Sequence, residues 1–122
     1  MGKTKTPKFY VHPKCSTCKA ARNFLQKHDI AVEEIDITTQ PPSNSELKRM
    51  LAFQGGQIRK LFNTSGIQYR ELKIKERLDG LSESDALSML TKNGMLVKRP
   101  FLLGETFGLV GFRENGWKET LR

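Results

Sequence analysis

Cysteine and histidine are scarce in this sequence, and long apolar runs are missing. The 122 residues include two cysteines and two histidines, which argues against a framework of disulfides and against a zinc site built from two cysteine pairs. No apolar run approaches the roughly 18 residues of a membrane-spanning helix. The basic start Met1–Pro7 has no apolar stretch behind it, so we expect a short disordered lead-in rather than a secretory signal, and a cytoplasmic protein.

Acidic residues are also few, with 13 Asp and Glu against 21 Lys and Arg, for a net charge of +8. A basic surface attracts nucleic acid, an acidic protein or a small oxyanion, and it is also ordinary for a solvated lysine-rich face. Basic residues do not alternate with aromatic ones as they do on surfaces that stack bases, so we expect no direct sequence-specific DNA binding. The length suits one domain, and nothing indicates an obligate dimer, so we expect a monomer.

Both cysteines lie in one tetrapeptide, Cys15 to Cys18, directly after the aromatic and β-branched run Lys8–Val11. We expect a helix to begin there, and its unpaired N–H groups and positive dipole end favour a thiolate. Lys14 and Lys19 act in the same direction. Cys15 is then the nucleophile and Cys18 the resolving partner that closes a disulfide. Half of a zinc site and a pair of inert buried cysteines remain as alternatives.

Hydrophobic periodicity predicts a strand, a helix and a second, parallel strand at the start of the chain. A Cys-x-x-Cys between a strand and a helix is typical of the opening of a thioredoxin-like fold. These elements cover residues 9–11, 16–28 and 31–37, and the apolar stripe of the helix consists of Ala20, Ala21, Phe24 and Leu25.

Residues 38–96 predict a helical insertion in this frame, which resumes with an antiparallel hairpin and a last helix. We therefore expect a single α/β domain over residues 1–122, with the frame at 8–37 and 97–122. Within the insertion we expect a helix capped by Ser43 or Ser45, with apolar residues from Leu47 to Phe53, and a short helix at 58–62. An irregular loop with one helical turn at 69–81 is expected to follow, and then a helix that opens at Ser82 and is ended by Asn93 and Gly94. The hairpin strands are expected at 98–103 and 107–112, and the last helix from 114 or 115 to 121.

Arg99 and Pro100 form a second segment of interest. A proline that opens a strand is compatible with a cis peptide bond, and in a thioredoxin-like layout this loop lies beside Cys15. The guanidinium of Arg99 could then donate to an oxyanion held against the thiolate, or it could form a surface ion pair. Arg59 has the same two interpretations. His12 is expected to be a hydrogen-bonding residue at the strand end.

Six motifs together resemble the ArsC/Spx family, thioredoxin-fold proteins related to glutaredoxin-linked arsenate reductases and to the Spx and MgsR redox regulators. The resemblance extends from residue 8 to 122 and implies a four-stranded mixed sheet with an inserted helical subdomain. The motifs are Tyr10-x-x-Pro13-x-Cys15-x-x-Cys18, Gln40-Pro41-Pro42, Phe62-Asn63-Thr64-Ser65-Gly66, Tyr69-Arg70-Glu71-Leu72, Gly94-Met95-Leu96-Val97-Lys98-Arg99-Pro100 and Gly111-Phe112.

The resemblance implies that Cys15 is the nucleophile and that Arg59 and Arg99 hold an oxyanion. It implies no bound cofactor and no metal, and an external thiol donor of the glutathione/glutaredoxin or thioredoxin type. Two positions depart from the reductases: Gly111 stands where a third arginine is expected, and Cys18 stands where they carry a non-cysteine residue. We expect a site with two guanidinium groups to hold a highly charged oxyanion less well.

Two functions follow from the resemblance. The first is a small thiol–disulfide oxidoreductase of the ArsC, or arsenate reductase-like, type, in which Cys15 attacks and Cys18 resolves. The alternative is an Spx/MgsR-like redox-sensing transcriptional regulator, in which the same pair is a disulfide switch and the partner is the C-terminal domain of the RNA polymerase α subunit. The segment 50–57 lacks the acidic, glycine-containing pattern associated with that contact.

Overall fold

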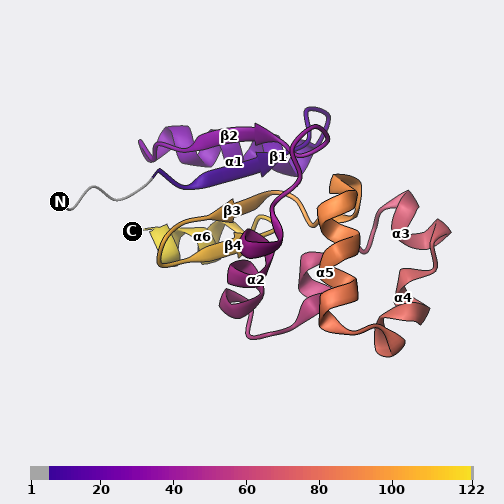
Figure 1. The fold of residues 1–122 in the computed structure, drawn as a ribbon. Coiled ribbons are helices and arrows are strands. Elements are labelled where there is room, and N and C mark those ends of the chain that lie inside the picture. Colours follow the sequence, from indigo (N-terminus) through magenta and orange to yellow (C-terminus); the bar gives the residue numbers. More distant parts are fainter. Residues whose placement is uncertain (1–5, 122) are drawn as a thin grey trace.

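A four-stranded mixed sheet lies at the centre of the protein (Figure 1), whose computed structural model describes residues 6–121. The strand order is β2-β1-β3-β4. Strand β1 (Lys8–Val11) is parallel to β2 (Glu33–Asp36) and antiparallel to β3 (Phe101–Leu103), which in turn is antiparallel to β4 (Gly108–Val110). The predicted mixed sheet is therefore confirmed.

Side chains of β1 alternate between the two faces of the sheet, as the period of a strand requires. Phe9 and Val11 face α1 (Ser16–Lys27) and α6 (Glu114–Leu121), and they pack there with Trp117. Tyr10 faces the opposite way, into a larger cluster that includes apolar residues of α2 (Asn44–Phe53) and α5 (Glu83–Lys92). The site described below lies where the ends of β1 and β3 meet this second layer.

The insertion between β2 and β3 is helical, and its outer part is more ordered than the sequence predicts. Most of residues 69–81, expected as an irregular loop with one helical turn, belong to short helices that lie furthest from the sheet (Figure 1). Tyr69, Ile74 and Leu78 are buried in the core cluster and hold these helices in place. Charged residues between these three obscure the apolar periodicity of the sequence. The short elements are η1 (Ile58–Leu61), α3 (Ile67–Glu71), α4 (Ile74–Arg77), η2 (Leu78–Gly80) and η3 (Gly94–Leu96).

Several boundaries differ from the predicted ones. The strands expected at 31–37, 98–103 and 107–112 are shorter, at 33–36, 101–103 and 108–110. Pro100 has no N–H to donate ahead of β3, and Gly111 turns the chain with a φ of +69° after β4. Ala20 and Phe53, expected to face inward, are exposed. The expected disordered lead-in lies mostly outside the described residues, but Pro7 is held to the sheet, since its carbonyl accepts the amide of Glu33 at 2.8 Å.

Glu46 ties the first strand to the insertion. Its carboxylate accepts Lys8 Nζ at 2.8 Å, the Tyr10 hydroxyl at 2.7 Å and the amide of Ser43 at 3.0 Å, while the Ser43 hydroxyl caps α2. Burial raises the pKa of Glu46, but the three hydrogen bonds outweigh it and hold the pKa below its ordinary value. Since the unfolded chain then binds more protons than the folded one, this stabilisation is present at neutral pH and lost in acid.

The substitution Glu46→Gln is expected to lower the free energy of unfolding by about 1–2 kcal/mol at pH 7, because the bond to Lys8 is lost and the other two hydrogen bonds lose their charged acceptor. The difference from the unmodified protein should shrink as the pH falls below 4.5, where Glu46 of the unfolded chain takes up its proton. Urea unfolding between pH 3 and 7 measures both effects. Glu119→Gln, at an exposed position of α6, is the control; equal effects of the two substitutions would contradict the role of Glu46.

Candidate functional site

Cys15 caps the N-terminus of α1. Its backbone is extended, with φ −87° and ψ 115°, and its Sγ accepts the amide of Cys18 at 3.3 Å. The turn before it is fixed because the amide of Cys15 donates to the carbonyl of His12 at 3.1 Å and the amide of Lys14 donates to His12 Nδ1 at 3.0 Å. The half-exposed sulfur of Cys15 therefore lies at the positive end of a twelve-residue helix without acidic side chains in its first turn.

Cys18 lies one turn further along and is fully buried, against Phe9 and Leu102 among others. Burial raises the pKa of its thiol to about 12, and the contact with Cys15 adds to the shift, whereas the backbone of His12 and the charge of Arg99 oppose it. Both cysteines are free thiols. The two sulfurs thus differ in accessibility: Cys15 is partly exposed at the helix cap, and Cys18 is buried.

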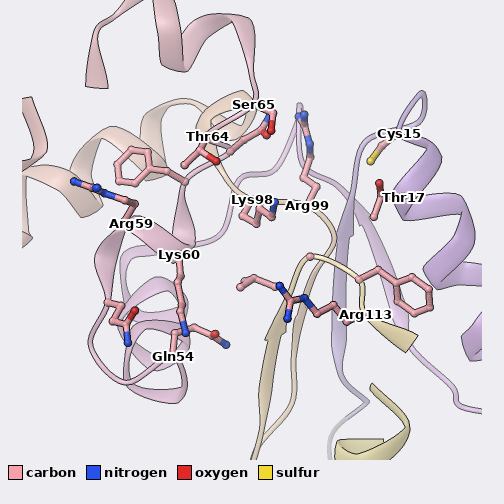
Figure 2. A pocket seen from close by; sticks show the side chains of 16 residues that line it. Cys15, Thr17, Gln54, Arg59, Lys60, Thr64, Ser65, Lys98, Arg99 and Arg113 are labelled. Atoms are coloured by element: carbon pink, nitrogen blue, oxygen red, sulfur yellow. The ribbon is translucent and has the colours of Figure 1, made fainter. Parts of the chain in front are cut away.

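An open cleft of about 890 Å³ begins at Cys15 and continues along the inserted region (Figure 2). Its walls come from residues 15–17, 54–65, 98–99 and 110–113. The lining is rich in cations and in uncharged polar side chains. The cations are Arg59, Lys60, Lys98, Arg99 and Arg113, and the uncharged polar residues include Thr17, Gln54, Gln57, Asn63, Thr64 and Ser65.

The two predicted arginines occupy different parts of this cleft. Arg99 follows η3 and precedes the cis bond to Pro100, and its charge acts on the Cys18 thiol, which places it close to the cysteine pair. Arg59 lines the cleft as well, but its guanidinium lies 3.8 Å from Asp79 and points away from Cys15 (Figure 2). The structure therefore brings Arg99 and the cysteines together and leaves the Arg59 guanidinium at a distance from them.

Three arginines of the described residues line this cleft, whereas the resemblance implied an oxyanion site with two. Arg113 points into the cleft from the turn after β4 (Figure 2), two residues past Gly111, where the resemblance led us to expect a third arginine. The bend at Gly111, whose carbonyl accepts the indole N–H of Trp117 at 3.1 Å, redirects the chain there. Lys60 and Lys98 were not singled out in the sequence either, and only the folded arrangement of the segments brings them to the same cleft.

The described part of the chain gives two further findings. No three His, Cys, Asp or Glu side chains between residues 6 and 121 gather as a metal site would require. None of the helices in this range is both long and apolar enough to span a membrane.

Comparison with known proteins places the chain among thioredoxin-like relatives. A family model described as "ArsC family" matches residues 10–120. The uncharacterized protein YusI of Bacillus subtilis is 44% identical over 111 residues, which cover 91% of this chain and 94% of YusI. The global transcriptional regulator Spx of Streptococcus agalactiae is 31% identical over 87% of this chain and 76% of Spx.

Solved structures agree with this assignment. A putative ArsC family related protein from Bacteroides fragilis superposes with a TM-score of 0.89 at 36% identity, over 96% of this chain and 98% of its own. A possible arsenate reductase from Streptococcus mutans gives a TM-score of 0.82 at 39% identity, over 88% and 92% of the two chains. The match of the family model over residues 10–120 and the 44% identity to YusI show that the chain belongs to the ArsC family.

Proposed function

We propose that the protein is a thiol–disulfide oxidoreductase in which Cys15 is the nucleophile and Cys18 the resolving thiol. The observation that carries this proposal is the asymmetry of the pair. Cys15 is accessible from the cleft and its sulfur accepts a backbone amide at the positive end of α1, whereas Cys18 is buried and held protonated. An accessible thiolate beside a second thiol one helical turn away is the arrangement that disulfide exchange requires.

The reaction has two exchange steps. The Cys15 thiolate attacks one sulfur of an external disulfide, a bond forms between these two sulfurs, and the other substrate sulfur leaves as a thiolate that takes a proton from water. Cys18 then gives up its proton and attacks Cys15 Sγ, so that a Cys15–Cys18 bond forms and the second substrate thiol leaves. Two electrons pass to the substrate, and an external thiol donor of the glutathione/glutaredoxin or thioredoxin type restores the dithiol.

The surroundings of Cys18 give these steps their order. While Cys15 is a free thiolate, burial and the neighbouring sulfur keep the Cys18 proton in place. Once Cys15 is in a mixed disulfide, its sulfur no longer carries a negative charge. The His12 backbone and the Arg99 charge still lower the pKa of Cys18. The second thiolate therefore becomes easier to form after the first attack. In this proposal Arg99 assists the resolving step, and any role of Arg59 in oxyanion binding stays a prediction.

Mass spectrometry of the reduced protein after incubation with glutathione disulfide tests the proposal. We expect the product to have lost two hydrogens and to contain a peptide pair joined through Cys15 and Cys18, with two glutathione molecules released per protein. A later addition of thioredoxin and its reducing system should return the original mass. A product that keeps one glutathione, or a protein that does not react, would contradict the assignment of Cys18 as the resolving thiol or of Cys15 as the nucleophile.

A second candidate function is that of a redox-sensing transcriptional regulator, which the 31% identity to Spx favours. In that case the same disulfide would switch the affinity for the C-terminal domain of the RNA polymerase α subunit. Binding of that domain to the reduced and the oxidised protein, measured by calorimetry, distinguishes the two functions. An affinity that changes with the redox state would support the regulator, and no binding in either state would remove it.

A further inference from the structure

We infer that the cleft binds an acidic polypeptide segment, and that the disulfide reduced by Cys15 is carried by that segment. This inference rests on the proposed thiol–disulfide exchange and specifies its substrate as a protein of acidic local sequence. The alternative occupant, a small thiol such as glutathione, is an outcome of the test below.

The charge of the cleft is of one sign. Five of its lining residues are cationic, and none of the lining residues in the described part of the chain is acidic. Among residues 6–121, only Arg59 of these five takes part in an ion pair, with the exposed Asp79. Lys60, Lys98 and Arg113 are therefore available for carboxylates of a ligand, and concentrated charge of this kind attracts and orients a partner of the opposite sign.

The cations are spread along the cleft and do not converge on a single point. Arg99 lies beside Cys15, while Lys60 extends to the opposite end near Gln54, and Arg113 points in between (Figure 2). A volume of about 890 Å³ is at the upper end of the range for small-molecule sites, roughly 300–1,000 Å³. One tetrahedral oxyanion would fill a small part of this space, whereas a few residues of extended chain would reach from the cysteine to the distal cations.

The uncharged polar residues complete a surface suited to a polypeptide. Gln57, Thr64 and Ser65 are exposed along the walls and can donate to and accept from peptide groups. Thr64 and Ser65 come from the loop that faces Cys15 across the cleft (Figure 2). When a substrate sulfur is bonded to Cys15, the neighbouring residues of the substrate therefore lie between hydroxyl groups and cations. Aspartate and glutamate side chains are favoured in these surroundings.

Three chromogenic mixed disulfides test the inference, each releasing 5-thio-2-nitrobenzoate when Cys15 attacks. The first joins this group to a cysteine peptide with flanking aspartates and glutamates, the second to the same peptide with lysines in their place, and the third to glutathione. We expect the acidic peptide to react at least about tenfold faster than the basic one at low ionic strength. It should also react faster than the glutathione derivative, and the preference should shrink at about 0.5 M salt, where exposed charges are screened.

Variants locate the effect in the cleft. The double substitution Lys60→Gln/Arg113→Gln is expected to slow the acidic peptide about tenfold and to leave the basic peptide unchanged or faster. The control Lys48→Gln/Lys75→Gln removes the same charge from exposed residues outside the cleft and should leave the ratio of the two rates unchanged. A ratio that falls equally in both variants would overturn the inference, since it would reflect net charge alone.

The outcomes separate this inference from the proposed function. Equal rates for the acidic and basic peptides, or a fastest reaction with glutathione, would overturn the acidic-polypeptide inference while thiol–disulfide exchange stands. No reaction with any of the three compounds would overturn the proposed function itself.

Discussion

Replacing Cys15 by serine is expected to slow reduction of an external disulfide by more than about a thousandfold, because a serine hydroxyl stays protonated and is a weak nucleophile at neutral pH. Cys18 cannot take over, since it is fully buried and its thiol has a pKa raised to about 12. Cys18→Ser should behave differently. Its Cys15 still attacks, but the mixed disulfide has no internal thiol to resolve it and accumulates as a stable adduct.

Stopped-flow release of 5-thio-2-nitrobenzoate from its glutathione disulfide, followed by intact mass, measures both variants. The expected pattern is no burst for Cys15→Ser and a single stoichiometric burst with a retained adduct for Cys18→Ser. Thr120→Ser, at an exposed position of α6 outside the cleft, is the control and should react like the unmodified protein. An adduct on Cys18 in the Cys15→Ser variant would show that the buried thiol is accessible and would reverse the proposed roles.

The opening of the chain was predictable because its signals are local. Each signal spans about a dozen residues or fewer. The signals are the alternation along β1, the Cys-x-x-Cys at the first turn of α1, and the apolar stripe of Ala21, Phe24 and Leu25. Ala20 is exposed because it lies at the edge of this stripe. The short helices over residues 67–80 were not predictable in the same way, since their order depends on buried anchors that contact distant parts of the insertion.

Residues of the candidate site were predictable from the sequence only where they belong to a recognisable motif. Arg99 precedes a proline at the start of a strand, and that pattern indicated both the cis bond and the proximity to Cys15. Arg113 was not identified as a residue of the site, because the bend at Gly111 cannot be read from residue types alone. Lys60 and Lys98 join the same cleft from segments nearly forty residues apart, which only the tertiary structure reveals.

Gly94 marks a close contact between the insertion and the sheet. It begins η3, directly after α5, and a Cβ atom at this position would lie 2.0 Å from the backbone oxygen of Ile37 and 2.9 Å from its carbonyl carbon. That oxygen cannot move freely, because the amide of Ile37 donates to the carbonyl of Val11 at 2.9 Å and continues the pairing of β1 and β2. Only glycine permits this approach of two backbones.

Gly94→Ala is therefore expected to lower the free energy of unfolding by about 3 kcal/mol, at the upper end of the cost of overpacking, since backbone must shift to admit the methyl group. Gly80→Ala is the matched control: a Cβ there meets no atom within 4 Å, so its effect should stay within about 0.5 kcal/mol. Urea unfolding of the two variants measures the difference. A Gly94→Ala protein as stable as Gly80→Ala would contradict this reading of the contact, since it would show that η3 can move away from Ile37 at little cost.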